Sequence, residues 1–240
     1  MAFNLQPIHE IVATRGVKIV VHGPPGVGKT VLSTTFAEPS RTGVICAEGG
    51  LLSIKDYAQQ HSMVGGEIRS FADFESSFSF FAYDFGALEW FRNIVLDSIS
   101  EIAEVCLQEE IRVKKDPRQA YGEMANKMKT MIRAFRDLHG YNVVFTAQQE
   151  REKTDEGTKF FPSFPGQQLA GAKNWMSHQF DEVFSYRIVT DAEGKPRRLL
   201  QTQPDQAYDA KDRSGKLDFW EEPNLQNVIN KIMQPVPNGQ

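Results

Sequence analysis

The chain has 240 residues, of which 40% are hydrophobic and 24% are charged, and its formal net charge is −4. This length suffices for one large domain with a substantial core. The small negative charge excludes a global basic field, so any nucleic-acid contact has to come from a local patch. Apolar runs of membrane-spanning length and an N-terminal signal core are both missing from the sequence. We therefore expect a cytoplasmic protein that does not contact a membrane.

Short apolar runs alternate with helical patterns along the chain, which predicts an α/β fold with a mostly parallel central sheet and helices on both faces. The last two predicted strands flank the turn-rich string DAEGKP, so they should form a C-terminal hairpin. We expect residues 1–16 to form an N-terminal arm, 17–205 the core, and 206–240 a tail with a short helix over 224–233. The predicted strands are 17–21, 43–47, 93–96, 142–147, 182–189 and 198–203.

Helices are expected between these strands. One should follow the first strand over 29–37, and a Phe- and Ser-rich stretch, 71–83, is a further candidate. Apolar residues from 99 to 106 recur at helical spacing. A longer stripe is typical of a core-facing helix and consists of Met124, Met128, Met131, Phe135 and Leu138. Cys46 and Cys106 lie in such apolar patterns, so we expect two buried thiols rather than a disulfide.

Residues 23–30 read GPPGVGKT, which matches the phosphate-binding pattern G-x-x-x-x-G-K-[ST] between a strand and a helix. Backbone N–H groups of such a loop converge on the α- and β-phosphates. Lys29 can reach the β- and γ-phosphates, and the Thr30 hydroxyl can bind Mg²⁺. The pattern predicts a site for ATP and Mg²⁺ built from Gly23, Pro24, Pro25, Gly26, Val27, Gly28, Lys29, Thr30 and Val31.

Two acidic residues end predicted strands. Asp97 ends the apolar run NIVLD and is expected to help hold Mg²⁺. Many AAA-type ATPases carry a catalytic glutamate directly after this aspartate, but Ser98 stands there, so the base must lie elsewhere. Glu48 follows the strand over 43–47. Because carboxyl ends of parallel strands share one rim, Glu48 can orient the attacking water. The alternative is that Asp97 and Glu48 are ordinary acidic residues at the ends of strands, Glu48 being solvated, with no role in catalysis.

The string AEGG with Glu48, VLDS with Asp97 and VVFTAQ with Gln148 resembles the pattern of RecA-type ATPases. The tail string AYDAKDRSGKL resembles the segment of RecA-like proteins that supplies cations to the next subunit's ATP. Over about residues 17–220, the chain looks most like phage-encoded RecA-like ATPases that act in single-strand annealing.

The resemblance implies a RecA-like P-loop NTPase core that hydrolyses ATP, stimulated by DNA, in DNA recombination. It implies that Gln148 senses the γ-phosphate, although Gln149 is a near-equivalent neighbour. It also implies that Lys211 and Arg213 act in trans on the ATP bound by the next subunit. The expected partners are single-stranded DNA, further copies of the chain in a ring or short filament, and a single-stranded DNA-binding protein. The location would be the bacterial host cytoplasm.

Two connections are candidates for DNA contact in this interpretation. The basic string RVKKDPR offers Arg112, Lys114, Lys115 and Arg118. The long polar connection 151–171 offers Lys153 and Lys159 for phosphates, with Phe160, Phe161 and Phe164 as stacking platforms. The alternative for the first connection is a solvated charge run. For the second, the alternatives are aromatic rings packed beneath the connection, or a connection that is merely disordered.

Two other functions compete with a DNA-dependent ATPase. A P-loop kinase for a small molecule or nucleotide usually needs an arginine-rich lid, and the long connection contains only Arg151. A nucleotide-switch protein with little turnover is the other possibility, although the guanine motif N/T-K-x-D is not found after a strand. DNA-stimulated ATP turnover distinguishes the first interpretation from these two.

Overall fold

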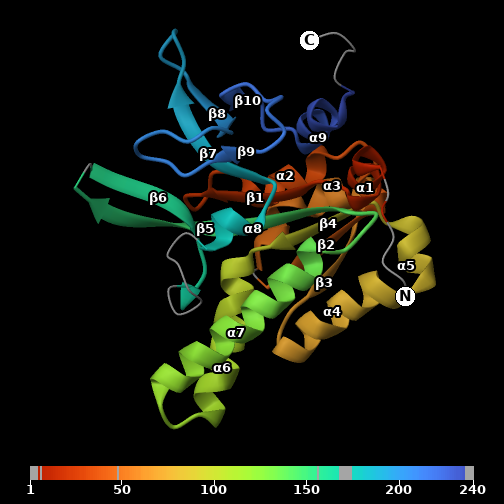
Figure 1. Ribbon diagram of the computed structural model, residues 1–240, viewed down its shortest axis with the longest axis vertical. Helices are drawn as coiled ribbons and strands as arrows, with labels where there is room; N and C mark the ends of the chain where they lie inside the picture. Colours follow the sequence, from red (N-terminus) through yellow and green to blue (C-terminus); the bar gives the residue numbers. More distant parts are fainter. Residues whose placement is uncertain (1–4, 6, 48, 156, 168–174, 236–240) are drawn as a thin grey trace.

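The structure is a computed structural model that describes residues 5, 7–47, 49–155, 157–167 and 175–235. Its centre is a parallel sheet in the order β7-β1-β5-β4-β2-β3 (Figure 1). Antiparallel strands extend this sheet, so the predicted α/β class is confirmed. The parallel strands are β7 (Glu182–Thr190), β1 (Lys18–Gly23), β5 (Asn142–Thr154), β4 (Asn93–Asp97), β2 (Thr42–Cys46) and β3 (Val64–Glu67).

Consecutive residues of the central strands face opposite cores, as the pleat of a strand requires. In β1, Val20 packs on one side, while Ile19 and Val21 pack on the other. The first core lies under α4 (Phe71–Tyr83), α6 (Ile99–Val113), α7 (Pro117–Arg136) and α8 (Trp175–Gln179). The second lies under α2 (Lys29–Leu32) and α9 (Leu225–Met233). Helices therefore cover both faces, as predicted, and the methionine stripe of α7 belongs to the first core.

The remaining helices are short. They are α1 (Ile8–Arg15), α3 (Lys55–Gln60), α5 (Phe85–Trp90) and the 3-10 turns Ser33–Thr35, Pro39–Arg41 and Gly49–Ile54. The helix expected over 29–37 is shorter than predicted, because α2 gives way to a 3-10 turn at Ser33. Hydroxyls of Ser33, Thr34 and Thr35 donate to carbonyls three residues earlier at 2.7–2.8 Å, competing with regular helical bonds. None of the described helices combines the length and apolar character needed to span a bilayer.

The predicted hairpin around DAEGKP is formed by β7 and β8 (Pro196–Gln201). The connection 151–171 differs from the expected irregular loop. β5 continues to Thr154 and pairs with β6 (Gly157–Ser163) along seven residue pairs. The two strands form an arm that projects from the sheet (Figure 1). Residues 168–171 of the connection lie outside the described residues.

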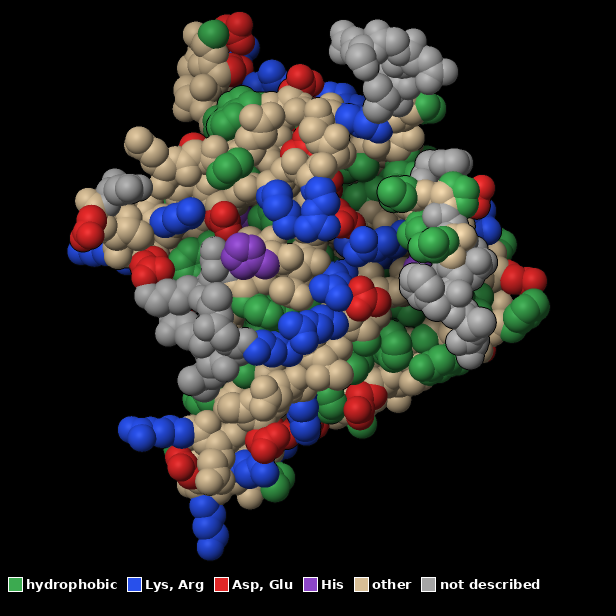
Figure 2. All heavy atoms as spheres, viewed as in Figure 1, with side chains coloured by type: hydrophobic (Ala, Val, Ile, Leu, Met, Phe, Trp, Pro, Cys, Tyr) green, Lys and Arg blue, Asp and Glu red, His purple; other side chains and the backbone are tan. Residues whose placement is uncertain are grey.

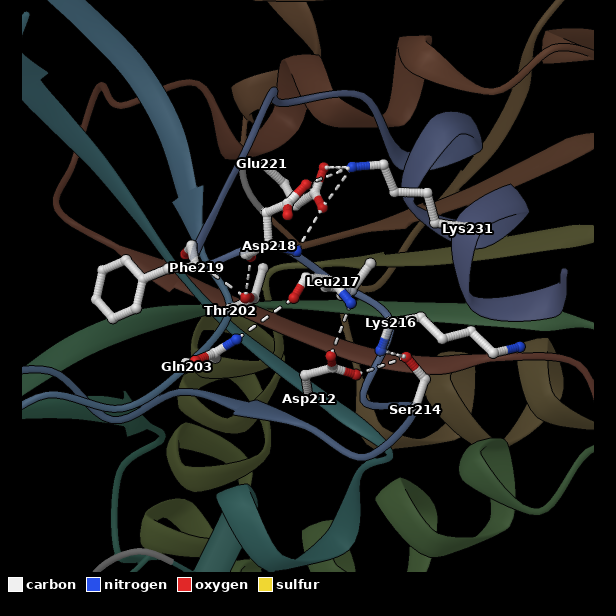
Figure 3. A network of polar contacts seen from close by, with 10 residues as sticks. All are labelled: Thr202, Gln203, Asp212, Ser214, Lys216, Leu217, Asp218, Phe219, Glu221 and Lys231. Carbon is white, nitrogen blue, oxygen red and sulfur yellow. Dashed lines mark hydrogen bonds and ion pairs between the residues drawn. The ribbon is translucent and has the colours of Figure 1, made fainter. Parts of the chain in front are cut away.

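The segment expected as a tail is integrated into the sheet up to the end of α9. β9 (Lys211–Asp212) pairs with β7, and β10 (Trp220–Glu221) pairs with β8. Figure 3 shows how polar contacts fix this segment: Lys231 of α9 binds the carboxylates of Asp218 and Glu221 at 2.8–3.0 Å. Asp212 accepts the backbone N–H of Leu217 at 2.9 Å. This segment thus packs on the rest of the domain through β9, β10 and α9.

Candidate active site

The phosphate-binding loop connects β1 to α2 and requires unusual backbone angles. Gly26 and Gly28 have φ values of 74° and 109°, which residues other than glycine adopt at a cost. A Cβ atom on Gly23 would lie 2.6 Å from the carbonyl oxygen of Tyr186, so β7 restricts this position as well. The glycines of the motif therefore allow the backbone conformation that this loop adopts.

Lys29 begins α2, and its ammonium group folds over the loop. Nζ donates to the carbonyl oxygens of Gly23 at 2.9 Å and Pro24 at 3.2 Å. Val27, by contrast, turns its side chain into the second core. Gly23, Pro24 and Val27 therefore shape the loop, whereas the other predicted loop residues line the pocket described below.

Thr30, in the first turn of α2, meets Asp97, the last residue of β4. The Thr30 hydroxyl donates to Asp97 Oδ2 at 2.6 Å, and Thr146 of β5 donates to Asp97 Oδ1 at 2.5 Å. Asp97 is 4% exposed, and these two hydroxyls fix its orientation. A hydroxyl and a carboxylate are oxygen donors of the kind that Mg²⁺ accepts while keeping several waters. The residues present thus fit the predicted metal, and their role as its ligands stays a prediction.

A pocket of about 610 Å³ opens between the loop and these residues. It brings together most of the predicted loop, Asp97 and Gln148, and it adds lining residues that sequence reasoning missed, among them Glu101, Tyr186 and Arg198. The described residues that line it are Pro25, Gly26, Gly28, Lys29, Thr30, Val31, Gly50, Ser53, Asp97, Ser98, Glu101, Gln148, Tyr186 and Arg198.

Gln148 and Arg198 reach this pocket from different strands. The Gln148 side chain donates to Glu101 Oε1 at 2.6 Å, and its backbone N–H donates to Ser100 Oγ at 2.8 Å. Arg198 of β8 donates from Nε to the carbonyl oxygen of Val27 at 2.9 Å, so its guanidinium group lies against the phosphate loop. Lys29 and Arg198 are the cations among the described lining residues.

His22, directly before the loop, joins it to the C-terminal segment. Its Nε2 lies 2.7 Å from the backbone oxygen of Asp209, and Ser177 donates to the Asp209 carboxylate. Burial lowers the pKa of His22 to about 4, so the imidazole is neutral near pH 7. Asp209 of the C-terminal segment is in this way anchored to the strand that precedes the phosphate loop.

Several predicted site residues lie away from the pocket or are not among the residues that the structure describes. Glu48 is outside the described residues, and its proposed role with water stays a prediction. Lys211 donates to the carbonyl oxygen of Ser177 at 2.7 Å, and Arg213 pairs with Asp181 at 2.8 Å. Both cations are thus engaged within their own chain, and their action on a neighbouring subunit is likewise untested.

The predicted DNA-binding residues occupy two separate projections (Figure 1). Arg112 lies in the last turn of α6 and Arg118 in the first turn of α7, so the basic string spans a tight connection between two helices. Lys114 and Lys115 lie in this connection, at its tip. The other projection is the β5–β6 arm, in which Lys153 is exposed and Lys159 is half-buried.

The aromatic residues of the arm do not all offer a surface for bases. Phe161 is 6% exposed and Phe164 is 2% exposed, so Phe161 cannot present the free ring face that stacking requires. For these two rings, the packed alternative is confirmed. Phe160 is half-buried and stacks on Tyr208 with ring centroids 4.8 Å apart, so one of its faces is already covered.

Part of this site has recognisable sequence signals. Glu101 follows Ser98 in the pattern S-x-x-E, and the Ser98 side chain accepts the backbone N–H of Glu101, as in a capping box. Tyr186 and Arg198 have no comparable local signal. Their position depends on the pairing of β7 with β1 and β8.

Comparison with known proteins identifies the domain. The sequence profile of the family described as AAA domain matches residues 15–214, which include the phosphate loop, Asp97 and Gln148. Among curated proteins, none matches the chain. A match over this much of the chain, together with the geometry of the loop and of Asp97, establishes that the chain belongs to the AAA domain family, whose members are nucleotide-binding ATPase-type domains.

Proposed function

We propose that this protein is a RecA-like ATPase that binds single-stranded DNA and promotes annealing or pairing of strands in DNA recombination. The observation that carries the ATPase part is the contact of Thr30 with Asp97 at 2.6 Å on the wall of the loop pocket. This contact places a hydroxyl and a carboxylate beside Lys29, an arrangement suited to a metal-bound triphosphate.

The chain's own residues divide the work of hydrolysis. Loop amides and Lys29 would hold the phosphates, and Thr30 with Asp97 would hold Mg²⁺, which would neutralise negative charge on the phosphates. Glu48 orients the attacking water in our interpretation. Glu101 is a second acid on the pocket wall, and it is the competing candidate for that role.

DNA dependence is supported by the connections between the pocket and the β5–β6 arm. Gln148 lies on the pocket wall and is the first residue of β5 to pair with β6, opposite Ser163. Ser100 accepts the N–H of Gln148 and donates to the carbonyl oxygen of Ser163 at 2.6 Å. A displacement of Gln148 by the γ-phosphate therefore reaches both strands of the arm.

Assembly into a ring or short filament is the remaining part of the proposal. Lys211 and Arg213 supply cations to the ATP of a neighbouring subunit, where charge develops in the transition state. For this to happen, they exchange their contacts with Ser177 and Asp181. A single-stranded DNA-binding protein is a further proposed partner, which would deliver coated strands.

The test is ATP turnover by the purified protein with and without single-stranded DNA. We expect Mg²⁺-dependent release of phosphate that rises several-fold with an oligothymidylate. The Lys29→Ala variant gives the background rate of phosphate release, because it lacks a charge-assisted hydrogen bond to phosphate worth about 1.5–3 kcal/mol. The proposal would be contradicted if DNA did not change ATP turnover and the protein had no affinity for single-stranded DNA at low salt. That result would favour a kinase.

A further inference from the structure

Basic residues lie on one side of α7 near both of its ends. Lys129, Arg133 and Arg136 are spaced by four and three residues, so they lie on the same side of the helix. Arg118 precedes Lys129 by three helical turns and lies on that side too. Figure 2 shows Lys and Arg side chains gathered across the middle of the face on which α7 and α8 lie.

Two further cations lie beyond the end of α7. Arg15 and Arg213 both pair with Asp181, at 3.9 and 2.8 Å. Arg136 binds Gln179 of α8 at 3.0 Å and pairs with Asp137. We call Arg118, Lys129, Arg133, Arg136 and Arg15 the α7 basic face. Within the described residues, the ion pairs of these five cations involve two carboxylates, Asp137 and Asp181.

The positive charge of this surface is therefore in excess, although the whole chain carries a net charge of −4. Cations concentrated on one face of an acidic protein attract an anionic partner locally. The partner that the charge pattern fits is a polyanion, because the cations form a row instead of converging on one point.

Trp175 organises two of these cations. Lys129 Nζ lies 5.9 Å and Arg133 Cζ lies 5.6 Å from the centroid of the Trp175 ring. The ring is 7% exposed, so it supports the cations through cation–π contacts and is not itself a stacking platform. Such a surface recognises phosphates and not bases, which makes its binding independent of sequence.

We propose that the α7 basic face binds the phosphate backbone of single-stranded DNA along α7; this inference rests on the proposed function. The row from Arg118 to Arg136 covers eighteen residue steps of the helix, or about 27 Å. The strand then enters at the predicted basic connection between α6 and α7 and continues along the helix to α8. The β5–β6 arm is joined to this surface through Phe164, which follows β6 and whose ring centroid lies 6.2 Å from that of Trp175.

The experiment is fluorescence anisotropy of a labelled oligothymidylate of about thirty nucleotides at several NaCl concentrations. The variant is Lys129→Gln/Arg133→Gln. The matched control is Lys195→Gln/Arg197→Gln, which removes the same charge from exposed positions of β8 and its turn. Melting temperatures check folding, and Arg133→Lys tests charge, because it keeps a cation over Trp175.

We expect the α7 variant to bind about tenfold more weakly at about 100 mM NaCl. The slope of log K against log[NaCl] should become shallower by about 1.4, since each phosphate contact on a single strand contributes about 0.7. The control and Arg133→Lys should retain the slope of the unmodified protein.

An α7 variant with unchanged affinity and slope would overturn the inference. If Lys153→Gln/Lys159→Gln then loses affinity, the proposed function stands, with DNA on the arm. Equal affinity of the unmodified protein for a duplex would overturn the assignment to single strands. No binding of the unmodified protein to any single strand at low salt, with or without an ATP analogue, would overturn the proposed function itself.

Discussion

The side-chain amide of Gln148 donates a hydrogen bond to Glu101 Oε1 at 2.6 Å, joining the rim of β5 to the first turn of α6. Both residues line the pocket that contains the phosphate loop. A γ-phosphate that attracts the Gln148 amide competes directly with Glu101. We therefore expect this contact to break when a nucleotide triphosphate binds in the pocket.

The first prediction concerns this contact. We expect Gln148→Ala to retain ATP turnover within about tenfold in the absence of DNA, because Gln148 does not hold the metal or the loop. Stimulation by single-stranded DNA should be lost, since the arm no longer responds to the pocket. The measurement is phosphate release with increasing oligothymidylate. Gln149→Ala is the matched control, and loss of stimulation in that variant alone would move the sensor to Gln149.

The second prediction separates the two candidate acids. We expect Glu48→Gln to keep ATP binding and to lower turnover by about two orders of magnitude or more, the usual scale for a general base. Glu101→Gln retains an oxygen that accepts the Gln148 amide, so turnover should fall far less. Single-turnover hydrolysis of both variants provides the comparison. A larger loss of turnover in Glu101→Gln than in Glu48→Gln would instead assign the role of orienting the attacking water to Glu101.

The third prediction assigns a role to Arg198. Its guanidinium group lies against the loop through the Val27 carbonyl and lines the pocket. We expect Arg198→Ala to raise the Kd for ATP about tenfold, because a charged hydrogen bond to phosphate contributes about 1.5–3 kcal/mol. Arg197→Ala, next along β8, removes an arginine paired with Glu222 and should leave the Kd unchanged. Equal effects of the two changes would argue for disturbance of the hairpin instead.

The fourth prediction tests action in trans. Lys211→Ala/Arg213→Ala should bind ATP, because its phosphate loop is intact, but it should be nearly inactive alone. Mixing it with Lys29→Ala should restore part of the turnover at interfaces that combine an intact loop with intact cations. Rates are measured as a function of the mixing ratio. Normal turnover by the double variant alone would contradict the trans model.

The fifth prediction concerns stability and pH. Burial, with nearby Asp212, raises the pKa of Glu182 from 4.5 to about 8. The folded state thus binds a proton that the unfolded chain releases between these values. The resulting stabilisation is fully present below about pH 4.5 and is lost as the pH rises through about 8. In the Glu182→Gln variant this side chain cannot ionise, so stability should depend less on pH over this range.

Melting temperatures from about pH 5 to pH 8.5 provide the measurement for Glu182. Glu193→Gln, in the exposed turn between β7 and β8, is the control and should follow the unmodified protein. A Glu182→Gln curve parallel to that of the unmodified protein would show that another group causes the loss of stability.

The central strands could be predicted from the sequence because each is an apolar run that is buried on both faces. β3 was missed for the opposite reason: its residues VGGE are all exposed at the sheet edge and include two glycines. The continuation of β5 past Gln148 is polar on both faces, so it lacks the alternation that indicates a half-buried strand.

The site was predictable where its chemistry is local in sequence. The loop motif and Asp97 each follow an apolar strand, and the parallel register brings Cys46, and hence the end of β2, beside Asp97. Arg198 was not predictable, because β8 reaches the loop only after pairing with β7, opposite Ile188. Phe161 was misjudged because an aromatic residue in a polar connection carries no sign of which way its ring turns.

The position of β1 between β5 and β7 has a consequence for biosynthesis. β1 leaves the ribosome before its two neighbours in the sheet, which begin at Asn142 and Glu182. Until both are made, Ile19, Val20 and Val21 have no sheet to enter, and contacts this distant in sequence form slowly. In nascent chains this apolar segment therefore stays uncovered until β5 and β7 have been made, a state that favours binding by chaperones.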